Sequence, residues 1–159
     1  MKIGVLKENK PNEKRVALTP SAVTKIKKLG YEISLQSGAG ELSNFFDTAY
    51  EQVGAIISSV DDIFKCDIIL KINKPSHDEI EKLSSNQTLI SFFSPATNTE
   101  SLKLCSKDNL NVLSMDSVPR ISRAQKMDAL SSMANVAGSR AVIEACLLYT
   151  SDAADDMQC

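Results

Sequence analysis

The sequence has 159 residues, of which 43% are hydrophobic and 24% charged, and its formal net charge at pH 7 is −2. This length and composition are typical of one domain around an ordinary core, and a chain with no tryptophan and 5% aromatic residues predicts an aliphatic core. The nearly balanced charge excludes a chain-wide field that would recruit nucleic acid, so any anion site has to be local.

Short apolar runs and cysteine spacing limit the classes of protein further. The amino-terminal run KIGVL is too short for a signal peptide and no apolar run approaches a membrane span, so we expect a cytoplasmic protein. The four cysteines form no CxxC pair, and the sole histidine, His77, favours a surface or capping role over metal binding. We therefore predict no metal site.

Six short runs of aliphatic and β-branched residues, each bounded by turn formers, predict strands. In chain order they are residues 2–6, 32–36, 54–58, 67–72, 88–93 and 111–115. Because these runs are almost continuously apolar, we expect six buried strands.

Amphipathic segments between these runs predict helices. In TPSAVTKIKKLG, Thr19 can cap the helix, Pro20 fits its first position and Gly30 ends it. Its apolar face is formed by Val23, Ile26 and Leu29. The other predicted helices are 47–54, 60–64, 77–83 and 99–109. This alternation predicts an α/β fold with a mainly parallel, Rossmann-like (flavodoxin-like) sheet, helices on both faces and a long linking helix at the carboxyl-terminal end.

Two loops carry small motifs. GAGELS, from Gly38, lacks the third glycine of a dinucleotide fingerprint and favours a turn. The loop after the first strand is basic and places Arg15 at the carboxyl edge of the sheet, where it can hold a carboxylate or phosphate bidentately. A solvated basic loop is the alternative.

Residues 124–145 are rich in alanine and predict one long helix. A stripe near one face contains Leu130, Met133, Ala134, Ala137 and Ala141. Small residues suit close packing against another domain or subunit, and folding back onto the chain's own sheet is the alternative. We expect residues 146–159 to be a non-family or disordered tail. The predicted organisation is an α/β domain over 1–123, an interdomain helix over 124–145 and that tail.

Two arginines stand at the entrance to this helix. Arg120 and Arg123 place fixed cations where the helix dipole is already positive, a position that favours acidic residues. An anionic ligand bound there would resolve the conflict.

Several stretches together resemble one known family. They are MKIGVLKENKPNEKRVALTP, SGAGELSNFFD, DIILKINKP and MDSVPRISRAQKMDALSSMANVAGSRAVIEA. From Met1 to about Ala145 the chain resembles the amino-terminal part of the alanine dehydrogenase and nicotinamide nucleotide transhydrogenase superfamily. RISRAQ and DALSSMAN are more similar to the transhydrogenase alpha subunit than to alanine dehydrogenase.

The resemblance implies an NAD(P) transhydrogenase, which transfers hydride between NAD(H) on this subunit and NADP(H) on a partner domain, coupled to proton translocation. Implied partners are a second copy of the subunit and an NADP-binding, membrane-embedded beta subunit. The parent would be cytoplasmic and peripheral to the inner membrane. The chain would be truncated before a Rossmann NAD-binding domain, so we expect it to be inactive alone.

The resemblance also implies a set of pocket residues. Side chains of Arg120, Gln125, Asp128 and Ser131 would line the nucleotide pocket, with backbone amides of Ile121, Ser122 and Arg123. Hydride transfer needs positioned rings rather than an acid or base, so Gln125, matching the nicotinamide carboxamide, takes the catalytic role.

Two positions depart from the alanine dehydrogenase branch. Asn73 and Ser94 stand where that branch has a lysine and a histidine that hold and protonate a keto acid. An alanine dehydrogenase-like amino-acid oxidoreductase and a non-enzymatic subunit-interaction module remain as alternative functions.

Overall fold

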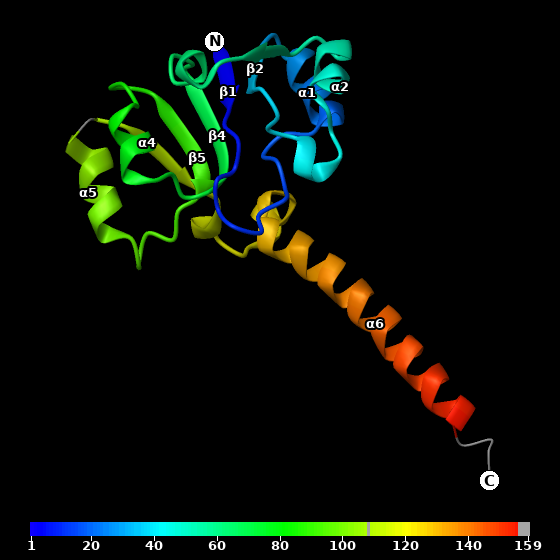
Figure 1. The fold of residues 1–159 in the computed structure, drawn as a ribbon. Helices are drawn as coiled ribbons and strands as arrows, with labels where there is room; N and C mark the ends of the chain where they lie inside the picture. The colour runs from blue at the N-terminus through cyan, green and yellow to red at the C-terminus, as the bar shows by residue number, and fades with distance from the viewer. Residues whose placement is uncertain (108, 156–159) are drawn as a thin grey trace. The chain divides into compact units, whose positions relative to one another are not determined.

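The computed structural model describes residues 1–107 and 109–155, which divide into two units at Ser117 and Val118. The first unit, Met1–Ser117, contains six strands (Figure 1). They are β1 (Lys2–Val5), β2 (Glu32–Gln36), β3 (Ile56–Ser58), β4 (Ile68–Asn73), β5 (Thr88–Phe92) and β6 (Asn111–Ser114). Its helices are α1 (Pro20–Lys27), η1 (Glu41–Ser43), α2 (Asp47–Gln52), α3 (Val60–Ile63), α4 (His77–Glu81), α5 (Thr99–Lys107) and η2 (Met115–Ser117).

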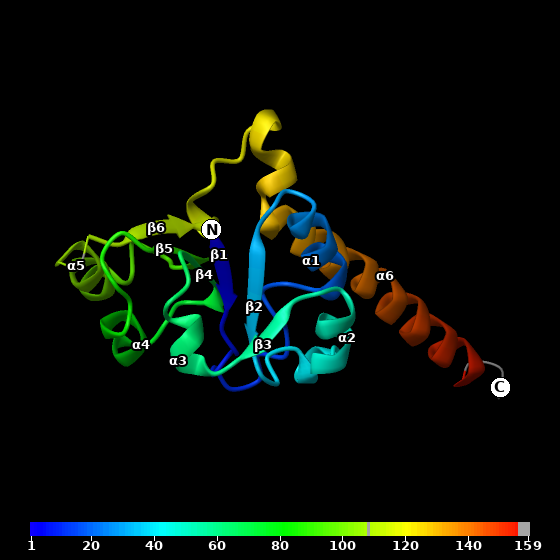
Figure 2. The same cartoon turned by 90° about the horizontal axis from the view of Figure 1, so that it is seen from above.

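The strands form one parallel sheet in the order β3-β2-β1-β4-β5-β6, which can be followed across Figure 2. The order reverses between β1 and β4, as in doubly wound Rossmann folds, and differs from the five-strand flavodoxin order. The predicted α/β class is confirmed, and the sheet is wholly parallel.

Two hydrophobic clusters cover the two faces of the sheet. One contains Val5, Ile33 and Leu35 with residues of α1 and α2, and the other contains Ile69 and Leu89 with residues of α3, α4 and α5. Figure 1 shows α1 and α2 beside β2, and α4 and α5 beyond β5. The helices therefore lie on both faces, and the buried side chains are mostly aliphatic, as predicted.

The prediction of six buried strands is wrong for the two edges. Ile56 on β3 is 55% exposed, as is Leu113 on β6. An edge strand has a neighbour on one side only, and neither of these short strands is fully covered by a helix. An apolar run reports strand propensity, but its place in the sheet decides its burial.

Helix α1 follows its sequence signals closely. The Thr19 hydroxyl accepts a hydrogen bond from the Ala22 amide at 3.4 Å, and Pro20 takes the first helical position. Gly30 follows with φ +88°, a conformation that favours glycine. Leu29 lies beyond the end of the helix at Lys27 and is 74% exposed, so its predicted place on the apolar face of this helix is wrong.

Gly4 lets α3 approach β1 closely. A Cβ atom at this position would lie 2.8 Å from Ile63 Cγ2 and 3.0 Å from the Ile63 carbonyl oxygen. The predicted turn at GAGELS is also present, since Gly38 has φ +72° and its amide donates to Asp47. The conformation of GAGELS is therefore explained by a turn, and no dinucleotide-binding motif is needed to account for its glycines.

The second unit begins at Val118 and contains η3 (Ser122–Met127) and α6 (Ala129–Asp155). Leu130, Val136 and Val142 are all exposed, and their six-residue spacing sets them roughly 120° apart around the helix. Apolar side chains are therefore not confined to the predicted stripe. Exposed apolar side chains thus point in several directions around α6, between polar residues such as Arg140 and Glu144.

The helix runs past Ala145 as far as Asp155, and the rest of the predicted tail, 156–159, lies outside the described residues. The proposed division into domain, interdomain helix and tail stays a prediction. Within the described residues, none of the helices has the length and apolar character required to cross a membrane.

Candidate functional site

The predicted pocket residues lie in the second unit, on the chain segment that leads into α6. Ile121 has an extended backbone, and its amide donates to the Pro119 carbonyl at 2.9 Å. η3 follows directly and ends at Met127, and the backbone of the next residue, Asp128, is again extended. Because the Ile121 amide already has a partner, it is a weaker candidate for anion binding than the amides of Ser122 and Arg123, in the first turn of η3.

Asp128 caps the amino terminus of α6. Its Oδ1 accepts from the amides of Leu130 at 3.0 Å and Ser131 at 3.3 Å, and its Oδ2 accepts from the Ser131 hydroxyl at 2.5 Å. An extended residue whose carboxylate binds the amides two and three positions on is the usual way to start a helix. The α-helix accordingly begins at Ala129, and the prediction that it begins at Ala124 is wrong.

One concave cavity of about 250 Å³ gathers most of the predicted site. It is lined by Arg120, Ile121, Ser122, Gln125, Asp128 and Ser131. Arg123 is the predicted residue that does not line it, which fits its assigned role through the backbone amide rather than the side chain.

The two charged side chains of this cavity differ in their partners, since Asp128 accepts hydrogen bonds and Arg120 makes none within the described residues. The hydroxyl and amide of Ser131 lower the pKa of Asp128, with the Leu130 amide and the charge of Arg120 adding to the effect, so Asp128 is an anion at neutral pH. Within the described part of the chain, no hydrogen bond or ion pair engages the Arg120 guanidinium or the Gln125 carboxamide. A fixed cation and a free amide are thus available to a ligand that has both an anionic group and an amide.

The carboxyl edge of the sheet in the first unit holds a separate polar group. Glu8 Oε1 accepts from the Ile72 amide at 2.6 Å, and its Oε2 accepts from the Asn73 amide at 3.2 Å and side chain at 2.9 Å. Asn73 Nδ2 also donates to Glu13 Oε2 at 3.0 Å. Asn73 therefore serves two carboxylates and joins the loop after β1 to the end of β4.

Arg15 lies in that same loop, as predicted, and holds a carboxylate bidentately. Its Nε donates to Glu13 Oε1 at 2.8 Å and its Nη2 to Glu13 Oε2 at 2.7 Å. The anion at Arg15 is therefore a side chain of the protein itself. Hydrogen bonds from Arg15 are the main cause that lowers the pKa of Glu13 to about 2, with Asn73 contributing.

Ser94 follows β5 and has φ +49°, which is uncommon for a residue other than glycine or asparagine. Asp116 holds this turn, since its Oδ1 accepts from the Phe93 amide at 3.1 Å and its Oδ2 from the Ser94 amide at 2.7 Å. Burial works to raise the pKa of Asp116, but bonds from Ser114 and Ser94 lower it on balance. The backbone of Ser94 is thus held by the Asp116 carboxylate. The side-chain hydroxyl of Ser94 is a poor general acid.

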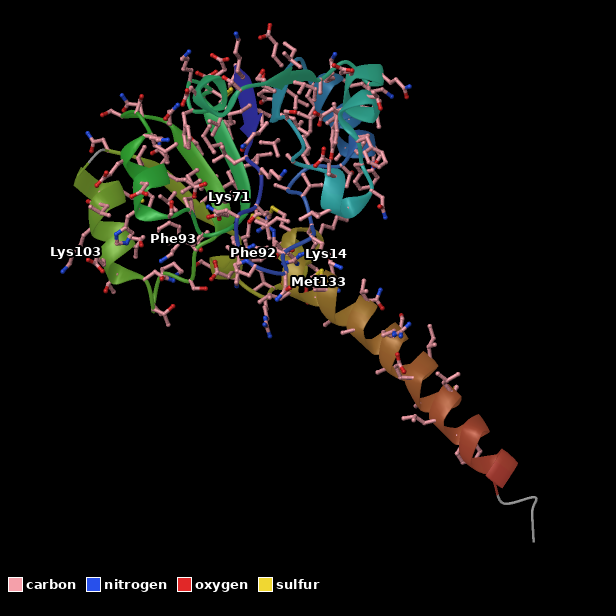
Figure 3. All side chains as sticks on the ribbon, viewed as in Figure 1. Lys14, Lys71, Phe92, Phe93, Lys103 and Met133 are labelled. Carbon is pink, nitrogen blue, oxygen red and sulfur yellow. The ribbon has the colours of Figure 1, made fainter. Side chains whose placement is uncertain are left out.

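The sequence analysis missed a buried ion pair beside this edge. Lys71 on β4 has a fully buried side chain whose Nζ lies 2.7 Å from both carboxylate oxygens of Glu79 and 3.2 Å from Asn9 Oδ1. Figure 3 labels Lys71 on its strand, Phe92 at the end of β5 and Phe93 directly after it. A lysine inside the apolar run DIILKI was the available signal, because a buried lysine requires a partner.

His77 takes a structural place. Ser76 rather than His77 caps α4, with Glu79 completing a capping box. The His77 Nε2 atom lies 3.4 Å from Ser101 Oγ, and Ser101 Oγ accepts a hydrogen bond from Lys74 Nζ at 3.2 Å. Among the described residues no cluster of three metal-ligating side chains occurs.

Comparison with known proteins places this geometry in context. The family described as "Alanine dehydrogenase/PNT, N-terminal domain" matches residues 4–137. NAD(P) transhydrogenase subunit alpha of Cereibacter sphaeroides is 50% identical over 147 residues, which is 91% of this chain and 28% of that protein. The chain therefore spans less than a third of this relative.

Solved structures agree with the sequence comparison. The crystal structure of transhydrogenase from Sinorhizobium meliloti superposes with a TM-score of 0.87 at 39% identity, covering 92% of this chain and 44% of that one. L-alanine dehydrogenase superposes with a TM-score of 0.71 at 28% identity, covering 74% of this chain and 33% of that one. Of these two structures, the transhydrogenase is the more similar.

Proposed function

The chain belongs to the alanine dehydrogenase/PNT N-terminal domain family, and from that premise we propose that it is the amino-terminal part of the NAD(H)-binding subunit of nicotinamide nucleotide transhydrogenase. The parent would transfer hydride between NAD(H) and NADP(H) and couple that transfer to proton translocation. The observation that carries the proposal is the cavity of the second unit. It is lined by the helix-capping Asp128 and by Arg120 and Gln125, whose guanidinium and carboxamide have no hydrogen-bond or ion-pair partner among the described residues.

This donor set fits a nicotinamide nucleotide. The Arg120 guanidinium can neutralise a phosphate group, which would resolve the placement of cations at a helix entrance. The Gln125 carboxamide offers one donor and one acceptor face, matching the amide of a nicotinamide ring. Asp128 and Ser131 hold each other at 2.5 Å, so their oxygens stay fixed while a ligand binds.

Positioning is the chemistry that these residues would contribute. NAD(H) supplies or accepts the hydride when it is bound, and such a transfer requires two rings held at near-contact distance. Gln125 would orient the nicotinamide, and Arg120 would anchor the anionic end. No general acid or base is needed, which agrees with Ser94 at the end of β5.

Partners and location follow from the same proposal. NADP(H) would be bound by a partner domain of the beta subunit, and the parent would lie at the cytoplasmic side of the inner membrane. A second copy of the subunit would supply part of the protein that covers α6, where Val136, Val142 and Ile143 are exposed.

An alanine dehydrogenase-like activity is the second candidate, favoured by the superposition on L-alanine dehydrogenase. Asn73 weighs against it, because its amide is already bonded to Glu8 and Glu13 and carries no charge for a keto acid. NAD-dependent oxidation of alanine by the full-length parent would favour this candidate over transhydrogenation.

Isothermal titration with NADH tests the proposal. We expect the full-length subunit to bind NADH and the 159-residue chain to bind weakly or not at all, because the resemblance places the main nucleotide grip in a further Rossmann domain. Low-micromolar binding by the chain alone would mean that the cavity is a complete site. A full-length subunit that does not bind NADH would contradict the proposed function.

A further inference from the structure

We propose that the start of α6 is a two-state switch, and that only one of its two states forms the cavity of the second unit. In the state seen in the structure, the helix begins at Ala129 under the Asp128 cap. In the other state it begins at Arg123 under a cap at Ser122. The identity of the ligand that selects the first state rests on the proposed function, but the two starting points do not.

The segment before α6 has a conformation that its sequence does not favour. η3 extends over six residues, Ser122–Met127, whereas 3₁₀ helices longer than three or four residues are uncommon. Its residues 124–127 are all good α-helix formers, and no glycine or proline occurs between residues 122 and 137. The α-helix is interrupted only at Asp128, where the backbone is extended. The same residues therefore have a continuous α-helix as their alternative.

The sequence contains two amino-terminal caps for this one helix. Asp128 forms the cap used in the structure, through its bond from the Leu130 amide at 3.0 Å. Ser122 and Gln125 match the pattern S-x-x-Q of a capping box, in which the serine hydroxyl accepts from the glutamine amide and the glutamine side chain bonds back to the serine amide. This second cap is unused in the structure, because Ile121 is the cap residue of η3 and the Gln125 side chain has no partner among the described residues.

The two caps exclude each other at the cavity. Residues from both sides of the break line it, Ser122 and Gln125 from η3 and Ser131 from α6. Residues three apart share a face of a 3₁₀ helix, so Ser122 and Gln125 contribute together. On a continuous α-helix, Gln125 and Ser131 would stand roughly 120° apart on a convex surface. The extended helix therefore has no concave surface here, and its capping box engages the Gln125 carboxamide.

A ligand in the cavity favours the state that forms it. Because the ligand contacts the Asp128-capped state and finds no cavity on the extended helix, its binding shifts the equilibrium toward the shorter α6. The apparent affinity is in turn reduced by the fraction of molecules in the extended state. The starting point of α6 is thereby coupled to occupancy of the proposed NADH site.

NMR of the 159-residue chain tests the switch without a nucleotide. A 3₁₀ segment brings an α proton close to the amide proton two residues on, whereas an α-helix brings it close to the amide proton four residues on. We expect the first pattern over residues 122–127 of the unaltered chain. Asp128→Ala removes the observed cap and should shift the equilibrium roughly fivefold toward the extended helix. A contact from the α proton of Ala124 to the amide of residue 128 should then appear or grow.

Matched substitutions in the Asp128→Ala background identify the second cap. Ser122→Ala should reverse most of the shift, because it removes the alternative capping hydroxyl. Ala129→Pro should abolish the shift, since proline fits the first position of the observed helix and is excluded from the interior of an extended one. Residue 128, with ψ 94°, already has the extended backbone that a following proline favours. Glu144→Ala, which removes the partner of Arg140 on α6, should leave both patterns unchanged.

Persistence of the 3₁₀ pattern in folded Asp128→Ala overturns the inference, as does an extension that survives Ala129→Pro. If Asp128→Ala does not fold, Asp128→Glu decides in its place. Glutamate keeps the charge, is a good helix former and is not a preferred cap, so it should also produce the extended pattern, and its failure to do so overturns the inference.

Titration of the full-length subunit with NADH tests the coupling. Ala129→Pro alone excludes only the extended state, so this variant should bind NADH at least as tightly as the unaltered subunit. A tenfold loss of affinity would overturn the coupling. An unaltered subunit that binds no NADH contradicts the proposed function instead, and the NMR result on the two starting points is independent of that outcome.

Discussion

Replacement of Lys71 by methionine is expected to cost about 3–5 kcal/mol of unfolding free energy, the usual loss when one partner of a buried ion pair is removed. The side chain of Lys71 is 0% exposed and that of Glu79 is 18% exposed. Methionine fills a similar volume, so the loss measures the unpaired charge more than a cavity. In a chain of this size the thermal midpoint should fall by about 6–20 °C.

A double-mutant cycle separates the charge from the packing. Glu79→Gln keeps an acceptor for the Ser76 amide, which donates to Glu79 Oε2 at 2.8 Å, so the α4 cap is retained. Lys71→Met with Glu79→Gln should therefore recover about 0.5–3 kcal/mol of the loss as a coupling energy. Urea unfolding of the three variants gives each value.

An exposed ion pair in the same unit provides the control. Lys65 and Asp62 lie 2.8 Å apart, with side chains 74% and 57% exposed. Lys65→Met should leave the unfolding free energy almost unchanged. The reasoning is refuted if Lys71→Met is as mild as Lys65→Met, or if the double variant is no more stable than Lys71→Met alone.

Four further predictions cover packing, pH, chemistry and assembly. Gly4→Ala should cost about 1–3 kcal/mol in urea unfolding, because the new Cβ meets Ile63 Cγ2 at 2.8 Å, and an unchanged midpoint would contradict that contact. The pKa of Glu13 is about 2 in the folded chain against an ordinary 4.5. Its contribution to the unfolding free energy is therefore complete above pH 4.5 and is lost as the pH falls toward 2. The difference in unfolding free energy between the unaltered chain and Glu13→Gln should shrink over that pH range. Gln125→Asn in the full-length subunit should slow hydride transfer much more than it weakens NADH binding, and equal losses in stopped-flow and titration would exclude an orienting role. Ala137→Glu should make the chain more monomeric in sedimentation velocity and disrupt the full-length assembly, whereas an unaltered chain that stays monomeric at high concentration would mean that α6 needs no second copy.

The sheet was predictable because its signals are local. Runs such as EISLQ combine aliphatic residues with flanking turn formers, and all six predicted runs contain a strand. Burial was not predictable at the edges, since Ile56 and Leu113 are exposed only because the topology places β3 and β6 outermost. The exposure of Leu29 likewise depends on where α1 ends, at Lys27.

The candidate site was predictable where a motif carries several residues together. RISRAQ and DALSSMAN contain the six residues that line one cavity. The start of α6 was not predictable from periodicity, because Asp128 reads equally well as a first-turn acid and as a cap. The anion bound by Arg15 was not predictable either. It is the Glu13 carboxylate, two residues away, and only the loop conformation places it against the Arg15 guanidinium.

NADH binding by the full-length subunit, compared between Arg120→Ala and Arg123→Ala, tests the central claim most directly. Both changes remove one exposed arginine, but only Arg120 lines the cavity with its side chain. A charged hydrogen-bonding group contributes about 1.5–3 kcal/mol, so Arg120→Ala should weaken NADH binding roughly tenfold or more. Arg123→Ala keeps the backbone amide and should bind NADH almost as the unaltered subunit does. Equal affinities for the two variants would contradict the placement of the nucleotide in this cavity.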